Sequence, residues 1–118
     1  MKVDWSSFHR LTRANVLDNA PASAGVYTLW VQLQNEKWRC YYVGQASNIE
    51  QRLLDHISDD EPNSGIRANV NKYISGFESA NVGKQTDRDG IEKYLYNYYK
   101  PECNEVDPGG TPIEINLS

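Results

Sequence analysis

The chain has 118 residues, of which 39% are hydrophobic and 24% are charged, and this suits one globular domain rather than two. No apolar run approaches the roughly 18 residues that a membrane-spanning helix needs, and residues 1–5 lack the apolar segment of a signal peptide. We therefore expect a cytoplasmic protein with no membrane association.

The net charge of −4 is a second constraint, because a negative protein is not drawn unspecifically to a polyanion. Residues 101–118 account for the whole excess, since they contain four acidic side chains and no Lys or Arg. Residues 1–100 hold 12 basic and 12 acidic side chains and are neutral. Any binding to nucleic acid is therefore expected to be weak and to depend on a few well-placed cations.

The cysteines and histidines give little sign of a structural metal or a disulfide framework. Without secretory features, we favour two reduced, semi-buried thiols at Cys40 and Cys103, although the two could in principle pair. Two Cys and two His, widely scattered, do not form a zinc-binding pattern.

The first half of the chain predicts a hairpin after a helical segment. Residues 1–20 carry apolar side chains at roughly helical spacing, which predicts a short helical lead-in. Residues 20–25 contain Pro, Ser and Gly and interrupt it. Two segments rich in β-branched and aromatic residues, 26–33 and 38–43, flank the polar turn at 34–37. They predict an antiparallel hairpin, with Gly44 ending its second strand.

Further elements follow at shorter spacing. Ser47 and Glu50 have the separation of a capping box, which predicts a helix over residues 48–58 with Ser47 as its N-cap. A second short helix is expected over residues 66–74 and a third strand over residues 77–82.

The C-terminal part predicts one more helix and a tail. Thr86 or Asp87 can cap a helix that runs to about Lys100, before Pro101. Residues 106–118 are expected to form an acidic C-terminal tail, whose Ile113 and Ile115 suit a short edge strand. Strands and helices together predict an α+β fold, with helices packed on a small antiparallel sheet.

Two tripeptides in the hairpin carry the most specific signal. Gly25-Val26-Tyr27 opens the first predicted strand, and Tyr42-Val43-Gly44 closes the second. Polar residues then recur at set places in the chain: Arg52 eight positions after Gly44, His56, Glu92 early in the last helix, and Asn104 at the end of Pro101-Glu102-Cys103-Asn104. Each feature alone is weak, but in this order the chain resembles the GIY-YIG nucleases over residues 21–104.

The resemblance implies a GIY-YIG nuclease domain over residues 21–105, with a three-stranded antiparallel sheet flanked by helices. It also implies hydrolysis of phosphodiester bonds, most simply in DNA, with one Mg²⁺ or Mn²⁺ per site. That chemistry needs charge stabilisation around the phosphorus and an activated water, which a few placed side chains and one hard cation supply.

The roles follow from the resemblance and from side-chain chemistry. Glu92 would hold the metal through oxygen and leave most coordination positions to water and phosphate. Arg52 offers a permanently charged planar fork to phosphate oxygens. Tyr27 is assigned as the general base and Tyr42 as a phosphate-orienting partner.

Two further residues are expected to support the site. His56 is one helical turn after Arg52, on the same face, where it can relay a proton or contact phosphate. Asn104 is expected to fix the site geometry by hydrogen bonds. Four residues are weaker candidates for contact with substrate: Gly44, Gln45, Ser47 and Lys72.

Other readings of the same residues stay open. Taken singly, a strand tyrosine packs, a helical Arg or Glu is solvated, and Pro-x-x-Asn after a helix is a stop signal. The acidic balance also fits a non-cleaving module that binds nucleic acid or a protein on a nuclease fold. A third reading is a nuclease subunit that gains target affinity from a protein partner or by self-association through tyrosines of the last helix.

Overall fold

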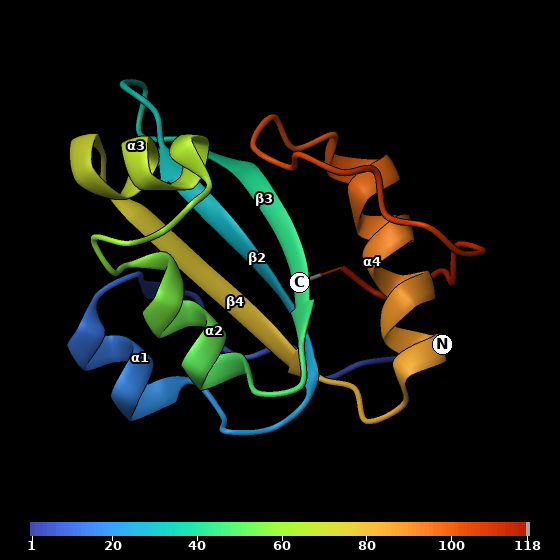
Figure 1. The fold of residues 1–118 in the computed structure, drawn as a ribbon. Helices are drawn as coiled ribbons and strands as arrows, with labels where there is room; N and C mark the ends of the chain where they lie inside the picture. Colours follow the sequence, from blue (N-terminus) through green and yellow to red (C-terminus); the bar gives the residue numbers. More distant parts are fainter. Residues whose placement is uncertain (118) are drawn as a thin grey trace.

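The computed structural model describes residues 1–117 and has an α+β fold (Figure 1). Its elements are β1 (His9–Arg10), α1 (Arg13–Asn19), β2 (Gly25–Gln32), β3 (Trp38–Ala46), α2 (Ile49–His56), α3 (Ser64–Lys72), β4 (Ser75–Asn81) and α4 (Gln85–Tyr99). All strand pairs are antiparallel, in the order β1-β4-β2-β3. The predicted hairpin is confirmed as β2 and β3.

The sheet has four strands, so the expectation of three is wrong. The additional strand, β1, pairs His9 with Phe77 and Arg10 with Gly76 of β4. It lies within the segment that was predicted to be a helical lead-in, of which only α1 is helical. A strand of two residues is too short to show an alternation of polar and apolar side chains. Sequence periodicity therefore does not detect it.

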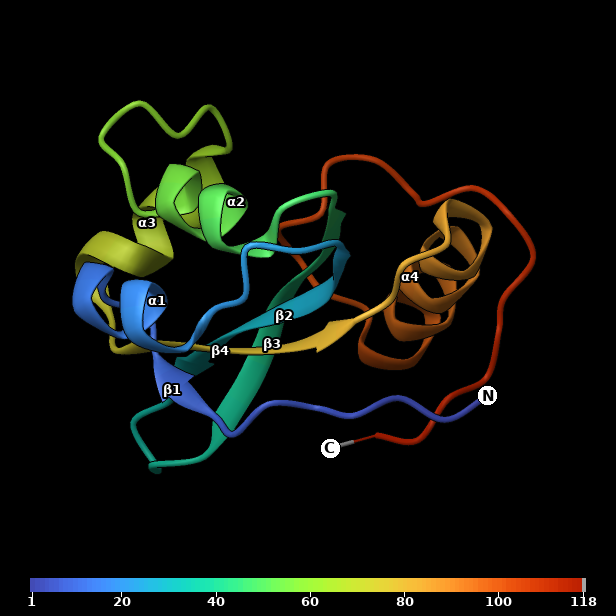
Figure 2. The ribbon, with the colours of Figure 1, turned by 90° about the horizontal axis from the view of Figure 1, so that it is seen from below.

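The helices cover both faces of the sheet and form three layers (Figure 2). Alternate side chains of β2 point to opposite faces, as the pleat requires. Tyr27, Leu29 and Val31 join the core under α1, α2 and α3. Val26 and Trp30 join the second core under α4.

A bulge in the hairpin brings two consecutive tyrosines to the same face. Tyr42 pairs with Leu29 and Cys40 with Trp30, so Tyr41 is the additional residue in β3. Tyr41 and Tyr42 both pack against the core under α1–α3, whereas Cys40 lies in the other core. The bulge therefore presents Tyr42 on the face that carries Tyr27.

The caps of two helices differ from those predicted. Asn48, not Ser47, is the N-cap of α2, because its side chain accepts a hydrogen bond from the Gln51 backbone N–H at 3.0 Å. The last helix begins at Gln85, before both predicted caps, and its N-cap Lys84 makes no side-chain capping bond. Its end agrees with the prediction, since Lys100 adopts a left-handed conformation before Pro101.

The N- and C-terminal segments run side by side on the α4 side of the sheet (Figure 2). The Asn116 side chain accepts a hydrogen bond from Val3 N–H at 2.7 Å and donates one to the Val3 carbonyl at 2.9 Å. Ile115 is buried and Ile113 packs on α4. The segment predicted as a tail thus contributes to the core, and the expected edge strand is absent from its described residues.

Both cysteines are free thiols, Cys40 buried and Cys103 half-buried. Of the tyrosines on α4, Tyr98 is 58% exposed, while the other three pack partly against the core. Within residues 1–117 we find no helix of the length and apolar character required to span a bilayer.

Candidate active site

The two motif glycines make room for the site rather than ending strands. Gly44 lies inside β3, opposite Tyr27, which corrects the expectation that it ends the strand. A Cβ on Gly44 would lie 2.5 Å from the Oη and Cζ atoms of Tyr27. A Cβ on Gly25 would lie 2.1 Å from the Ala80 carbonyl oxygen. Each glycine therefore permits a close approach that a larger side chain would block.

Tyr27 is fully buried and is held by a histidine. Its hydroxyl lies 2.7 Å from His56 Nε2, and His56 Nδ1 lies 3.1 Å from the Glu61 carboxylate. His56 and Glu61 are buried as well. Tyr27, His56 and Glu61 thus form an unbroken chain of hydrogen bonds from the sheet to the loop between α2 and α3.

The second motif tyrosine, Tyr42, packs on the same group. Its ring centroid is 6.2 Å from that of Tyr27 and 5.3 Å from that of His56. Burial raises the pKa of both phenols, that of Tyr27 most strongly, while the neighbouring Arg52 guanidinium acts in the opposite direction. Arg52 is therefore close enough to favour a phenolate at either tyrosine.

Glu92 faces this group from α4, on the other side of a small cleft. The Glu92 cleft, as we term it, has a volume of about 250 Å³ and includes Tyr42 and Asn104 in its lining. Burial raises the pKa of the Glu92 carboxyl, and a hydrogen bond from the Gln45 side chain at 3.1 Å opposes the rise. The same Gln45 amide also donates to Asp89 at 2.7 Å, so Gln45 links two acids of α4 to β3.

The surroundings of Glu92 fit a hard cation bound by few protein ligands. Among residues 1–117, no three His, Cys, Asp or Glu side chains are grouped as a ready-made metal cage. Mg²⁺ does not require one, because it keeps several waters and is commonly held by one or two carboxylates together with substrate phosphate. Glu92 presents a half-buried carboxylate to a cleft that has room for that hydration shell.

Asn104 fastens the C-terminal segment to the free edge of the sheet. Its side chain accepts a hydrogen bond from Val43 N–H at 3.0 Å and donates one to the Val43 carbonyl at 2.9 Å. Cys103 N–H adds a bond to the Tyr41 carbonyl. Since β3 is an edge strand, these bonds satisfy backbone groups that would otherwise be exposed, directly beside Tyr42.

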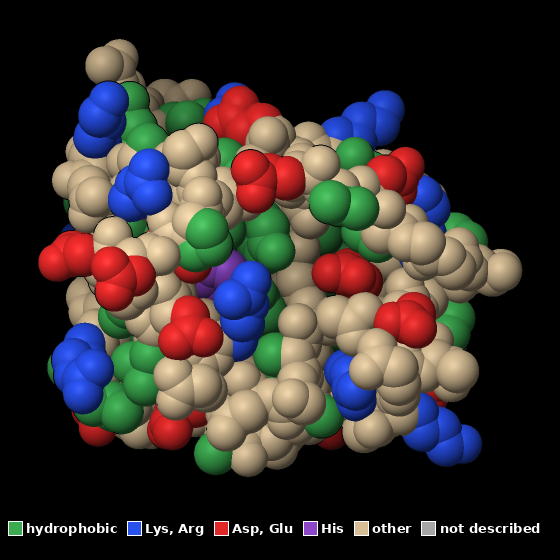
Figure 3. Space-filling model, in the orientation of Figure 1, with side chains coloured by type: hydrophobic (Ala, Val, Ile, Leu, Met, Phe, Trp, Pro, Cys, Tyr) green, Lys and Arg blue, Asp and Glu red, His purple; other side chains and the backbone are tan. Residues whose placement is uncertain are grey.

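A second cleft, also of about 250 Å³, lies at the start of α2. This Arg52 cleft is lined by Arg52 together with Gln45, Ser47 and Asp55. Most of the side chains that line it are polar, and Figure 3 shows this face of the molecule with basic, acidic and histidine atoms close together around a hollow. Gln45 lines the Arg52 cleft and bonds to Glu92, so the two clefts adjoin.

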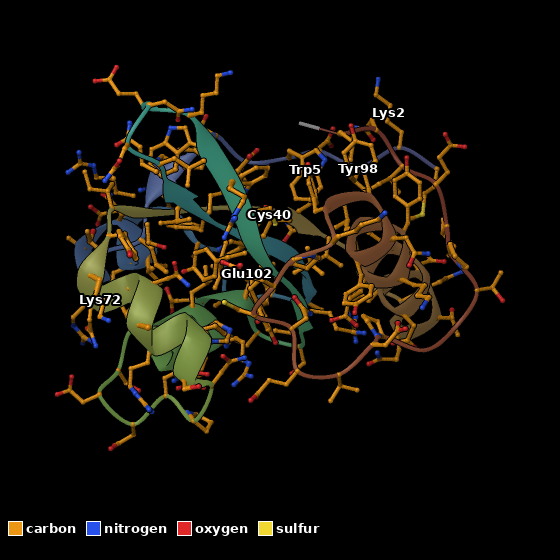
Figure 4. All side chains as sticks on the ribbon, turned by 90° about the horizontal axis from the view of Figure 1, so that it is seen from above. Lys2, Trp5, Cys40, Lys72, Tyr98 and Glu102 are labelled. Carbon is orange, nitrogen blue, oxygen red and sulfur yellow. The ribbon has the colours of Figure 1, made fainter. Side chains whose placement is uncertain are left out.

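Lys72 lies apart from the other candidates. It is exposed in the last turn of α3, and Figure 4 shows it on the opposite side of the sheet from Tyr98 of α4. A larger hollow, of about 350 Å³, is lined by Val31, Tyr73 and the ion pair of Arg39 with Glu102. Because Arg39 and Glu102 are paired with each other, the described residues that line this hollow present no unpaired charge to a phosphate or a cation, and we prefer the two clefts as the candidate site.

Sequence reasoning missed two acids at the site, Glu61 and Asp89. Glu61 follows Asp59 and Asp60 in a polar loop, where a buried side chain cannot be distinguished from a solvated one. Asp89 precedes Glu92 by three positions and therefore lies on the same face of α4. That spacing was the available signal for Asp89.

Comparison with solved structures identifies the architecture. The GIY-YIG N-terminal endonuclease domain of UvrC from Thermotoga maritima, solved with magnesium as its catalytic divalent cation, superposes with a TM-score of 0.57 and 22% identity. The alignment covers 78% of this chain and 93% of that domain. The chain has the GIY-YIG fold. A point mutant of the same Thermotoga GIY-YIG domain gives a TM-score of 0.58 over 80% of this chain and 94% of that one, with 21% identity.

The curated relatives agree with the GIY-YIG assignment. UvrABC system protein C of Aquifex aeolicus is 31% identical over 101 residues, which is 84% of this chain and 17% of the relative. UvrABC system protein C of Dictyoglomus thermophilum is 28% identical over 88 residues, or 75% of this chain and 14% of the relative. The chain therefore spans less than a fifth of the length of either relative. No protein-family model matches the sequence.

Proposed function

We propose that the chain is a divalent-metal-dependent endonuclease that hydrolyses phosphodiester bonds in DNA. The observation that carries this proposal is the convergence of Tyr42, Arg52 and Glu92 on two adjoining clefts, with the buried Tyr27 ring stacked on Tyr42. The charges of Arg52 and Glu92 both act on the pKa values of the Tyr27 and Tyr42 phenols. The Thermotoga domain of the same fold is an endonuclease domain bound to magnesium, which supports both the reaction and the cation.

The side chains divide the work by their chemistry. Arg52 binds non-bridging phosphate oxygens through its planar fork and stabilises the charge that develops on them. Tyr42, beside Arg52 and Glu92, orients the phosphate through its hydroxyl. Tyr27 accepts a proton from the attacking water and passes its own toward His56, to which it is already hydrogen-bonded.

Glu92 holds one Mg²⁺ or Mn²⁺, a cation that supplies Lewis-acid stabilisation of the departing oxygen. Gln45 orients the Glu92 carboxylate by its hydrogen bond, and Ser47 lies in the Arg52 cleft where a neighbouring nucleotide can contact it. Asn104 keeps the wall of the Glu92 cleft attached to β3. Lys72 has a peripheral role, in which its positive charge attracts the phosphate backbone.

The experiment is a cleavage assay on supercoiled plasmid, single-stranded DNA and branched DNA, with Mg²⁺, Mn²⁺ or a chelator. We expect nicking or cutting of at least one substrate with either cation and none with the chelator. Intact DNA of every kind in the presence of both cations would contradict the proposal.

A second candidate function, a module that binds without cleavage, is favoured by one observation. Acids lie in and beside the clefts and repel a phosphate backbone: Asp55 lines the Arg52 cleft, Glu105 lines the Glu92 cleft, and Asp89 is hydrogen-bonded to Gln45. Titration of salt separates the two functions, because phosphate-driven binding weakens steeply with salt, whereas a protein interface responds little. Metal-independent binding of nucleic acid or protein without turnover would favour the non-cleaving module. Cleavage only after addition of a protein partner would favour the reading as a subunit of a larger nuclease.

A further inference from the structure

Glu61 is a buried acid to which the proposed reaction assigns no role. It is 2% exposed, in the loop between α2 and α3, whose neighbouring acids Asp59 and Asp60 are exposed. A carboxylate removed from water is costly unless hydrogen bonds compensate it. One carboxylate oxygen lies 3.1 Å from His56 Nδ1, and the other accepts from Asn63 N–H at 3.2 Å.

The loop is built so that Glu61 stays in place. The backbone carbonyl of Glu61 accepts a hydrogen bond from the Arg67 guanidinium at 2.6 Å. The Asn63 side chain caps α3 by accepting from Ile66 N–H and donates to the Cys103 carbonyl. The orientation of Glu61 toward His56 is therefore fixed by contacts to α3 and to the C-terminal segment, independently of any substrate.

The contact with Glu61 determines which nitrogen of His56 carries the proton. A carboxylate only accepts, so His56 Nδ1 must donate to it, and neutral His56 then has a free lone pair at Nε2. That nitrogen lies 2.7 Å from the Tyr27 hydroxyl, which must therefore be the donor. Burial lowers the pKa of His56 and so favours this neutral form, while Glu61 acts against the shift.

We propose that Glu61 is a positioning residue that holds His56 as the proton acceptor for Tyr27, so that Tyr27 relays the proton of the attacking water to His56. This inference rests on the proposed nuclease function and assigns the proton its destination. Burial makes a free Tyr27 phenolate unfavourable. A relay avoids this phenolate, because Tyr27 receives the proton of the water while it gives its own proton to His56.

The step balances in atoms and charge. The water oxygen forms a bond to phosphorus as one of its O–H bonds breaks, and that proton goes to the Tyr27 oxygen. The original Tyr27 proton moves to His56 Nε2, giving an imidazolium paired with the Glu61 carboxylate. The bond from phosphorus to the leaving oxygen breaks, and its electron pair stays with that oxygen, which is protonated by solvent. The histidine and acid act as they do in a nucleophile, histidine and acid triad, except that the nucleophile here is water and Tyr27 relays its proton to the histidine.

The first test measures the tautomer and needs no activity. Nitrogen-15 NMR of the imidazoles distinguishes an Nδ1–H ring from an Nε2–H ring, and His9→Gln removes the signals of the second histidine. We expect the Nδ1–H tautomer at His56 in the otherwise unmodified protein. In Glu61→Gln, whose amide can donate to Nδ1, we expect a shift to Nε2–H. An Nε2–H ring with Glu61 present would overturn the inference.

The second test is kinetic and includes a matched control. Glu61→Gln should lower kcat on the order of 10²-fold with little change in KM, whereas Asp59→Asn removes one exposed charge from the same loop and should leave both unchanged. The groups that face His56 are Tyr27, Tyr42, Arg52, Asp55 and Glu61. Of these only Glu61 is changed, so the acidic limb of the pH–kcat profile should move to lower pH.

A purely structural role for Glu61 would not move that limb. Unchanged kcat and an unchanged limb in folded Glu61→Gln protein would overturn the inference. If the unmodified protein cleaves no DNA, the nuclease proposal fails, but the tautomer still decides whether Glu61 orients His56. The tautomer of the unmodified protein also decides this point if Glu61→Gln does not fold.

Discussion

The ring of Tyr27 lies directly over Gly44, so closely that a Cβ at residue 44 would be 2.5 Å from the phenol oxygen. We predict that Gly44→Ala displaces Tyr27, lowers the free energy of unfolding by about 1–3 kcal/mol through overpacking, and abolishes most activity. Urea unfolding and a cleavage assay measure the two effects. Gly83→Ala is the control, because a Cβ there meets nothing within 4 Å. Equal stability and activity in the two variants would contradict this explanation of the motif glycine.

The Asn104 side chain makes the two backbone hydrogen bonds with Val43 that a neighbouring strand would make. Loss of this side chain should therefore loosen the C-terminal segment. We predict that Asn104→Ala lowers the free energy of unfolding by about 1–3 kcal/mol, because a backbone donor and acceptor lose their partners. The Val43 amide should also exchange with solvent faster. Hydrogen exchange read by NMR checks this, with exposed Asn97→Ala of α4 as the control. Unchanged protection of the Val43 amide in Asn104→Ala would show that the Asn104 side chain does not hold the C-terminal segment on β3.

The buried histidine predicts how stability depends on pH. Burial lowers the pKa of His56 below its ordinary value of 6.5, so the unfolded chain takes up this proton more readily than the folded one. The resulting stability is fully present above pH 6.5 and is lost as the pH falls from there through the folded pKa. Urea unfolding between pH 7.5 and about pH 5 measures it. In His56→Gln this part of the slope should disappear, and an identical slope in both proteins would contradict the assignment.

Gln45 is predicted to tune the affinity for metal. Its hydrogen bond lowers the pKa of the Glu92 carboxyl against the effect of burial. Removal of the bond in Gln45→Ala should raise that pKa and weaken Mg²⁺ binding, on the order of 10-fold. Calorimetric titration at neutral pH and at pH about 5.5 tests this, since the deficit should grow at the lower pH. Gln51→Ala, which loses only a bond to exposed Asp55, should bind as the unmodified protein does.

The candidate site residues were predicted from the resemblance, and the position of several of them in the fold could be predicted because they lie in regular elements. The periodicity of the hairpin and of α2 is enough to predict which faces carry Tyr27, Arg52 and His56. The contact of Tyr42 with Tyr27 is less secure, since it depends on a bulge at Tyr41 that no composition signal marks. Glu61 lies beyond prediction because its burial is decided by Arg67 and Asn63, through contacts that only the folded loop makes.

In the fold, too, the regular elements could be predicted and the features that depend on long-range contacts could not. Strands with several paired residues and helices with an apolar face were predicted, whereas β1 has two residues and its pairing with β4 is long-range. The N-cap of α2 is Asn48, one position after the predicted Ser47. Both residue types can accept a capping hydrogen bond, so the sequence alone does not distinguish between them. The segment after Asn104 has the composition of a tail, yet Ile115 is buried beside the N-terminal segment.

The central claim, that Arg52 and Glu92 act on one phosphodiester, is tested most directly by metal-dependent cleavage of supercoiled plasmid. The unmodified protein, Arg52→Ala and Glu92→Ala are compared with Arg13→Ala and Asp60→Ala, which remove exposed charges of the same sign away from the clefts. We predict Mg²⁺- or Mn²⁺-dependent nicking by the unmodified protein and both controls, and a loss on the order of 10³-fold in the two site variants. Cleavage that survives both site substitutions, or its absence from folded unmodified protein with either cation, would contradict the account.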